Sequence, residues 1–174
     1  MPGWELIGEE ERQAVLNVFD AAPHGHLFTN KQRVREFEEA FAASLGVPDA
    51  VAVSSGTAAL KVGLTALGGG RGDEVLTQAH TFVATVEAIV DCGATPVIVE
   101  VDRSLNMDPT DLKRKLTDRT KVILPVHKLG APCRMLPILN LARDAGCAVL
   151  EDTAQAYRGT YHGTPLGTLG DVGC

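Results

Sequence analysis

Small hydroxyl-bearing residues and a glycine follow a short β-branched run in the stretch Val51–Leu60, which reads Val-Ala-Val-Ser-Ser-Gly-Thr-Ala-Ala-Leu. This pattern predicts a strand, a tight turn and the start of an alanine-rich helix. Main-chain N–H groups in the first turn of a helix have no partner inside the helix, and the helix dipole adds partial positive charge there. Ser55, Gly56 and Thr57 therefore form a candidate phosphate site. The same residues also suit a simple helix cap.

Side chains that can do chemistry also follow three other predicted strands. They are His80-Thr81-Phe82, His127-Lys128 and Asp152-Thr153-Ala154-Gln155. In a parallel sheet, ligands bind at the carboxyl ends of the strands, so we expect these groups to meet the candidate phosphate site at one edge. That edge would then combine a phosphate site, an aromatic ring and a carboxylate.

Short apolar runs alternate with helical patterns and must position these groups. The predicted strands are Glu74–Thr77, Pro96–Val101, Val122–Val126 and Ala148–Glu151. The predicted helices are Thr57–Leu67, Phe82–Asp91, Pro109–Leu116 and Leu136–Asp144. Asp108 before Pro109 is a favourable helix start, because Asp caps helices and Pro is tolerated at the first helical position. The alternation predicts an α/β fold, with a mostly parallel sheet and helices on both faces.

The N-terminal part, residues 1–48, is predicted to be a separate helical segment, and the α/β domain is predicted over residues 49–174. The range Gly8–Phe19 begins with acidic residues, which suits a helix N-terminus. A second helix carries one apolar stripe, formed by Val34, Phe37, Phe41 and Leu45. His24 and His26 lie in the loop between these helices.

Composition excludes several classes of function. The 174 residues carry a formal net charge of −6, which argues against nucleic-acid binding because that requires a basic surface. No apolar run is long enough to span a bilayer, so a soluble cytoplasmic protein is expected. The four cysteines lack the Cys-x-x-Cys spacing of zinc sites and are predicted to be free thiols, with no metal bound.

The three groups at the predicted sheet edge suit a flat, phosphorylated ring that contains nitrogen. Pyridoxal 5'-phosphate (PLP) has these features. A dinucleotide fits less well because no Gly-x-Gly-x-x-Gly occurs, and the absence of a Gly-Lys pair excludes a Walker phosphate loop.

Seven motifs, in order along nearly the whole chain, resemble those of the DegT/DnrJ/EryC1/StrS aminotransferases. The motifs are Ser-Ser-Gly-Thr-Ala-Ala-Leu (54–60), Gly-Asp-Glu-Val (72–75), Thr-Phe-Val-Ala-Thr (81–85), Gly-Ala-Thr-Pro-Val (93–97), Asp-Arg-Thr-Lys (118–121), Pro-Val-His (125–127) and Glu-Asp-Thr-Ala-Gln-Ala (151–156). These PLP-dependent enzymes of fold type I aminate keto sugars, usually nucleotide-linked ones, and some cyclitol ketones. The resemblance implies the large domain of that fold, a homodimer, and an amino-acid donor such as glutamate.

The resemblance also implies roles for the matching residues. Gly56 and Thr57, with Ser55 adjacent, resemble the phosphate site of the cofactor. Phe82 resembles the ring that stacks on the pyridine; the alternative for Phe82 is an ordinary core aromatic.

Asp152 resembles the carboxylate that pairs with the pyridine nitrogen, which keeps that nitrogen protonated so that the ring accepts electrons. The alternative for Asp152 is a helix N-cap after the strand. Gln155, expected on the same side of a helical turn, resembles the contact to the ring hydroxyl. His80 and His127 are expected to line the pocket or to form hydrogen bonds.

One feature of the family is missing. In the family, a strand beginning like Gly170–Cys174 runs on to the lysine that forms the Schiff base with the cofactor, but this chain stops short of it. The C-terminal small domain is also absent, so we expect either a fragment of a longer protein or a natural truncation. Lys128 follows a strand and is a conceivable substitute, although a surface loop position suits it better.

Three functions stay open at this stage: a keto-sugar aminotransferase in the complete protein, an inactive PLP-binding or subunit-interaction module, and a sugar dehydratase of the same family. Asp152-Thr-Ala-Gln155 favours the aminotransferase. The residues around 24–30 are candidates for the sugar pocket, but the sugar itself is not predicted.

Overall fold

The computed structural model describes residues 6–21 and 31–174. The chain divides into two compact units, Met1–Ala52 and Val53–Cys174, which we call unit 1 and unit 2. His24, His26 and the rest of the loop considered for the sugar pocket lie outside the described residues. Among the helices of the described ranges, none has the length and apolar character needed to cross a bilayer.

Unit 1 contains the two predicted helices, α1 (Glu9–Ala21) and α2 (Gln32–Leu45). Three glutamates occupy the first turn of α1, where the positive end of the helix dipole favours them. The α2 helix ends at Gly46, whose left-handed backbone angle (φ 70°) glycine adopts without steric cost. Within the apolar stripe of α2, the Phe37 and Phe41 rings stack with centroids 5.6 Å apart.

Unit 2 is built on a five-stranded sheet in the order β2-β1-β3-β4-β7, in which every neighbouring pair is parallel. The strands are β1 (Glu74–Gln78), β2 (Thr95–Val99), β3 (Thr120–Leu124), β4 (Ala148–Glu151) and β7 (Val172–Gly173). A small antiparallel hairpin of β5 (Thr160–Tyr161) and β6 (Thr164–Pro165) lies between β4 and β7 in sequence.

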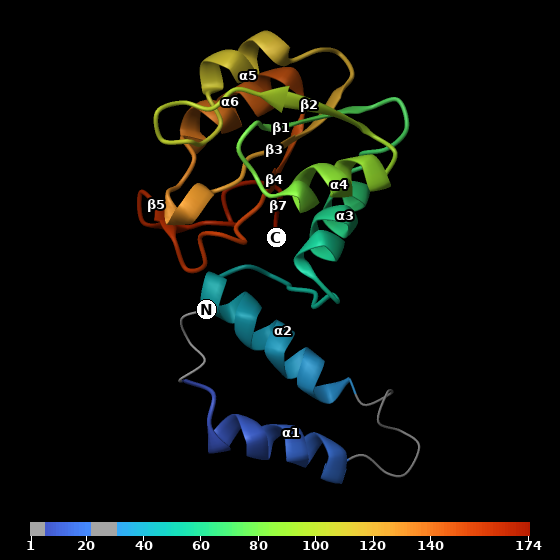
Figure 1. The fold of residues 1–174 in the computed structure, drawn as a ribbon, viewed down its shortest axis with the longest axis vertical. Coiled ribbons are helices and arrows are strands. Elements are labelled where there is room, and N and C mark those ends of the chain that lie inside the picture. Colours follow the sequence, from blue (N-terminus) through green and yellow to red (C-terminus); the bar gives the residue numbers. More distant parts are fainter. Residues whose placement is uncertain (1–5, 22–30) are drawn as a thin grey trace. The chain divides into compact units, whose positions relative to one another are not determined.

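Helices cover both faces of this sheet (Figure 1). The α3 (Gly56–Ala66) and α4 (Val83–Asp91) helices lie on one face, and α5 (Pro109–Lys115) and α6 (Met135–Ala145) lie on the other. The Asp108 carboxylate accepts a hydrogen bond from the Thr110 N–H at 2.9 Å, so α5 begins with the predicted cap. The predicted α/β fold, with a mostly parallel sheet between helices, is confirmed.

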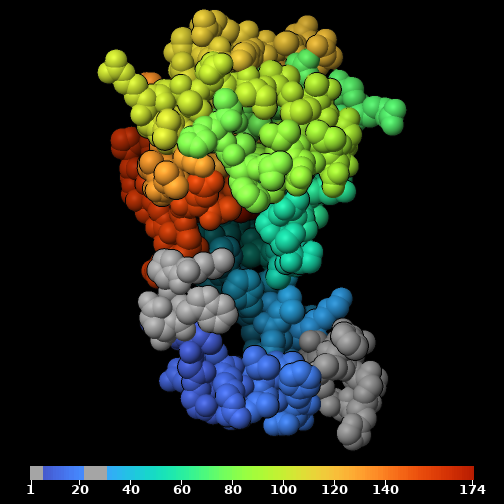
Figure 2. Space-filling view, viewed as in Figure 1, coloured from blue at the N-terminus to red at the C-terminus, as the bar shows by residue number. Residues whose placement is uncertain are grey.

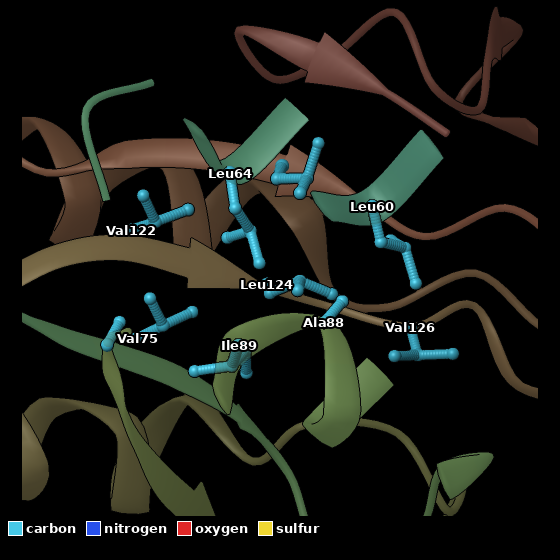
Figure 3. Packing of buried hydrophobic residues seen from close by; sticks show 10 residues of the cluster. Leu60, Leu64, Val75, Ala88, Ile89, Val122, Leu124 and Val126 are labelled. Carbon is cyan, nitrogen blue, oxygen red and sulfur yellow. The ribbon is translucent and has the colours of Figure 1, made fainter. Parts of the chain in front are cut away.

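Alternation along the strands divides the core into two layers. Val75 faces α3 and α4 while Leu76 faces α5 and α6, and Leu124 and Ile123 divide in the same way. Figure 3 shows the first layer, in which side chains of α3 and α4 meet those of the strands. The outward side of α4 belongs to the visible surface of unit 2, drawn in green in Figure 2. Burial on both faces explains why the strands read as continuous apolar runs.

The predicted strand at Val51–Val53 is wrong. This segment has no regular structure, and the Val51 side chain is 76% exposed. It pairs with no strand in the described part of the chain. The preference of valine for strands depends on packing and on a hydrogen-bonding neighbour, so it does not create a strand here.

Two predicted strands also end earlier than expected. After β2, Val101 forms an isolated antiparallel bridge with Met107, and after β3, Val126 forms a parallel bridge with Asp152. The second bridge matters for the site, because it ties the residue after β4 to the end of β3. The Asp152 N–H donates to the Pro125 carbonyl at 2.9 Å.

Replacement of Gly173 by alanine is expected to destabilise unit 2 by about 1–3 kcal/mol through overpacking. A Cβ atom at Gly173 would lie well inside the van der Waals contact distance of the Gly167 carbonyl oxygen, so β7 and the backbone at Gly167 would have to move apart. Urea unfolding measures the effect. Gly70→Ala is the matched control, because its Cβ would make only ordinary contact with the Cys92 carbonyl at 3.9 Å. Equal stability of both variants would contradict the assignment of a close backbone approach at β7.

Candidate active site

A cavity of about 400 Å³ lies at the carboxyl edge of the sheet, within unit 2. The start of α3, the start of α4, the segment after β4 and the last residue form its wall. Its lining residues are Gly56, Thr57, Leu60, Phe82, Ala84, Thr85, Asp152, Ala154, Gln155 and Cys174. Five of the six predicted cofactor-binding residues are therefore brought together, and Ser55 is the exception.

The N-terminus of α3 presents main-chain donors to this cavity. The Ser55 hydroxyl accepts a hydrogen bond from the Ala58 N–H at 3.1 Å, so its side chain caps the helix. The N–H groups of Gly56 and Thr57 form no hydrogen bond to any other residue of the described ranges. A Cβ atom at Gly56 would meet nothing within 4 Å, so there is open space beside these donors. Such free donors at a helix N-terminus suit an anion.

Asp152 supplies a buried carboxylate on another wall of the cavity. It is 5% exposed, and its two oxygens accept hydrogen bonds at 3.1 Å, Oδ2 from the Thr85 hydroxyl and Oδ1 from the Ala154 N–H. Burial raises the pKa of Asp152 above its ordinary value, although these hydrogen bonds and the nearby His127 oppose the shift. A positively charged ligand group would lower the pKa and keep the carboxylate ionised.

No helix follows β4, which corrects the predicted helical turn after Asp152. Residues 153–159 form two short turns, 154–155 and 157–158, and no helix, so the Asp152 side chain does not act as a helix cap. Asp152 and Gln155 nevertheless line the same cavity. The Gln155 Oε1 atom accepts a hydrogen bond from the Leu129 N–H at 3.2 Å, which leaves the amide nitrogen as the group that can donate to a ligand.

Phe82 precedes the first turn of α4 and carries a ring that lines the cavity. The side chain is 66% exposed, so the alternative of an ordinary core aromatic is wrong. An exposed apolar ring at a cavity wall is suited to stack on a flat ligand.

The other strand-end groups named in the sequence do not line the cavity. His80 is exposed, and Lys128 lies in the short 3₁₀ helix Lys128–Gly130. The backbone N–H of Lys128 donates to the Asn106 carboxamide oxygen at 2.9 Å. Among the residues that line the cavity there is no lysine, which gives no support to Lys128 as a substitute for the family's catalytic lysine.

His127 is fully buried, does not line the cavity, and uses both ring nitrogens in hydrogen bonds. Its Nδ1 accepts from the Cys133 N–H, and its Nε2 lies 3.0 Å from the Glu151 Oε2 atom. Since Nδ1 accepts, the ring proton is on Nε2 and is donated to Glu151. The hydrogen-bonding role expected for His127 agrees with this position.

Glu151 is a structural centre that sequence reasoning missed. Besides His127, its carboxylate accepts hydrogen bonds of 2.7–3.1 Å from the N–H groups of Gly167, Leu169 and Gly170. Burial raises the pKa of Glu151, but these hydrogen bonds outweigh burial and hold it below the ordinary value. Glu151 thereby attaches the segment before β7 to the end of β4.

Thr85 and Cys174 also line the cavity without having been predicted. Thr85 belongs to the motif Thr-Phe-Val-Ala-Thr, and its position three residues after Phe82 on a helix start was a usable signal. No sequence signal pointed to Cys174. Burial raises the pKa of the Cys174 thiol to about 11, so the thiol is protonated at neutral pH. Within the described ranges, no cluster of three or more His, Cys, Asp or Glu residues suits a metal ion.

Comparisons with known proteins agree with this geometry. The model of the DegT/DnrJ/EryC1/StrS aminotransferase family matches residues 6–174. The chain is 43% identical over 168 residues to the spore coat polysaccharide biosynthesis protein SpsC of Bacillus subtilis, covering 96% of this chain and 42% of that protein. It is 47% identical over 137 residues to the GDP-perosamine synthase of Caulobacter vibrioides, covering 78% of this chain and 37% of that protein.

Solved structures include a similar one, the aminotransferase from Psychrobacter cryohalolentis, with a TM-score of 0.86 and 38% identity. That match covers 96% of this chain and 42% of the other. This chain therefore spans about two fifths of the length of these three proteins.

Proposed function

Because the chain belongs to the DegT/DnrJ/EryC1/StrS aminotransferase family, we propose that its cavity binds PLP and that the protein transfers an amino group from an amino acid to a keto sugar. One observation carries the proposal: free helix N-terminal donors, an exposed aromatic ring and a buried carboxylate line the same cavity. These groups match the phosphate, the flat ring and the ring nitrogen of PLP. Bound PLP supplies an electron sink for the carbon that loses a proton.

In this proposal, the residues on each wall of the cavity contact a different part of PLP. The N–H groups of Gly56 and Thr57 hold the phosphate, with the dipole of α3 adding to the attraction. The Phe82 ring covers one face of the cofactor ring, and the Gln155 amide donates to the ring oxygen. Asp152 keeps a proton on the ring nitrogen, because a carboxylate in a buried site strongly favours a neighbouring cation.

The substrate class rests on the relatives. One of them is a synthase of the nucleotide-linked sugar GDP-perosamine, and another acts in polysaccharide biosynthesis. We therefore expect a keto sugar, nucleotide-linked or free, or a cyclitol ketone as acceptor, and glutamate as donor. The family resemblance also implies a homodimer, which sedimentation of the protein would test.

A second candidate function is PLP binding without covalent attachment, in a module that does not itself catalyse transamination. The cavity lining formed by the described residues contains no lysine, so it holds PLP in this candidate through hydrogen bonds, stacking and charge alone. The two candidates share the cavity and differ in whether PLP becomes linked to a lysine.

PLP binding is the direct test of the proposed function. We expect the 174-residue chain to bind PLP reversibly, with a change in PLP absorbance, and to yield no borohydride-stable adduct at Lys128 in peptide mapping. Phe82→Ala should weaken binding about fivefold, because a stacked ring contributes beyond its buried area. Tyr157→Ala is the matched control, since Tyr157 is also an exposed aromatic (76%) but does not line the cavity. Failure of the wild-type chain to bind PLP would refute the proposed function.

A further inference from the structure

We propose that Thr85 is a positioning residue for the Asp152 carboxylate, and that it acts as the middle member of a one-directional hydroxyl chain from Thr81 to Thr85 to Asp152. The part of this inference that concerns PLP rests on the proposed function. The chain itself is a feature of the protein alone and can be tested without cofactor.

The geometry of the chain is continuous. Thr81 precedes α4, and its hydroxyl lies 2.8 Å from the Thr85 hydroxyl. The Thr85 Oγ1 atom lies 3.1 Å from Asp152 Oδ2. Thr85 is 1% exposed, whereas Thr81 is half-buried, so the chain runs from the edge of the protein to a buried carboxylate.

The direction of the chain follows from proton counting. An ionised carboxylate only accepts hydrogen bonds, so Thr85 must donate its single hydroxyl proton to Asp152. Thr85 then has no proton left for Thr81, and Thr81 must donate to Thr85. Each hydroxyl in such a series polarises the next, which strengthens the last hydrogen bond.

Both oxygens of Asp152 are held as a result. Oδ2 accepts from Thr85 on α4, and Oδ1 accepts from the Ala154 N–H in the segment after β4. Two donors on different elements fix the plane of the carboxylate, while each oxygen keeps a second lone pair for a ligand. Without Thr85, only Ala154 would restrain the side chain.

Other titratable groups surround this carboxylate. His127 lies at the end of β3, Glu151 is the preceding residue on β4, and Cys174 follows β7. In the described structure, none of these three residues donates a hydrogen bond to the Asp152 carboxylate, although the His127 main-chain N–H donates to the Asp152 carbonyl oxygen at 3.1 Å. Loss of the Thr85 hydroxyl should therefore change the Asp152 pKa directly, because His127, Glu151 and Cys174 keep their positions around the carboxylate.

A carboxyl titration of the cofactor-free chain tests the inference. Aspartate side chains labelled with ¹³C are followed by NMR against pH, and the Asp152 signal is identified by its loss in Asp152→Asn. Thr85→Val should raise the Asp152 pKa by about one unit, since a charge-assisted hydrogen bond to the ionised form is lost. Thr85→Ser should restore the wild-type value. Thr81→Val should produce a smaller rise.

Thr77→Val is the matched control for the loss of a buried hydroxyl. Thr77 is fully buried, and its hydroxyl donates to the Leu124 carbonyl at 2.9 Å instead of to a carboxylate. Its replacement should lower stability without moving the Asp152 titration. Circular dichroism shows whether each variant folds. If Thr85→Val does not fold, the Asp152 titration is compared between Thr81→Val, which removes a hydroxyl of the chain, and Thr85→Ser, which keeps it.

PLP affinity separates this inference from the proposed function. If the wild-type chain binds PLP, Thr85→Val should weaken binding about fivefold and Thr85→Ser should restore it. An unchanged Asp152 pKa in Thr85→Val would overturn the inference while leaving the proposed function intact. If Thr85→Val does not fold, an unchanged Asp152 pKa in Thr81→Val would do the same. Absence of PLP binding by the wild-type chain, with the titration shifts present, would overturn the proposed function and leave the hydroxyl chain supported.

Discussion

Asp152→Asn is expected to weaken PLP binding at least tenfold and to slow transamination by the protein about a thousandfold, the scale found when a single preorganised electrostatic contact is removed. The amide has nearly the size of the carboxylate but carries no charge. It therefore cannot keep a proton on the ring nitrogen, and the cofactor ring loses much of its capacity to accept electrons. The binding effect is measured by PLP titration of the 174-residue chain, and the rate is measured on the complete protein with glutamate and a keto sugar.

Asp118→Asn provides the comparison for this prediction. Asp118 is an exposed aspartate that does not line the cavity, so the same chemical change there should leave PLP affinity as it is. Circular dichroism of both variants tests whether the fold is retained. If Asp152→Asn bound PLP as tightly as the wild type, the assignment of Asp152 to the ring nitrogen would be wrong.

Glu151→Ala is expected to lower the free energy of unfolding by about 3–5 kcal/mol, the range for breaking a buried, hydrogen-bonded charge. The carboxylate accepts from His127 and from three N–H groups of residues 167–170. Alanine would leave the buried His127 ring and the three half-buried N–H groups without this acceptor. Urea unfolding gives the difference, and Glu100→Ala, at an exposed glutamate, should cost far less. A loss of under about 1 kcal/mol would show that water or repacking satisfies these donors.

The same carboxylate makes stability depend on pH. The hydrogen bonds hold the pKa of Glu151 in the folded protein below its ordinary value, despite burial. A lowered folded-state pKa means that Glu151 stabilises the fold fully above the unfolded pKa of about 4.3, and that this stabilisation is lost as pH falls through the folded pKa. Glu151→Gln removes the titration. The stability difference between wild type and Glu151→Gln should therefore shrink below about pH 4, and a constant difference at all pH values would contradict the lowered pKa.

Much of unit 2 was predictable because local signals agree there. Short apolar runs such as Val122–Leu124 can be buried on two faces only in a parallel sheet covered by helices. Asp108 and Pro109 mark a helix start by their own chemistry, and the structure has that start. The topology then brings strand ends to one edge, which is why Phe82 and Asp152 could be expected in one site from sequence position alone.

The two wrong secondary-structure predictions, at Val51–Val53 and after Asp152, have a common cause. A strand at Val51–Val53 requires a neighbouring strand to hydrogen-bond with. A helical turn after Asp152 requires that helical hydrogen bonds stabilise these residues more than hydrogen bonds to the segment around β7 do. In the structure, the Thr153 N–H instead donates to the Cys174 carbonyl at 2.7 Å. Local preference cannot anticipate such a partner, because it lies 21 residues away in sequence.

The sequence by itself determined the α/β fold, the family, and the chemical groups at the ends of the strands, because periodicity, turn residues and motif order are local properties of the chain. Only the tertiary structure decided which groups share one cavity and what surrounds them. It joined Thr85 to Asp152 across 67 positions and paired the buried His127 ring with Glu151. Such contacts depend on how elements pack, since burial and hydrogen-bond partners, which set the charge and orientation of a side chain, come from segments distant in sequence.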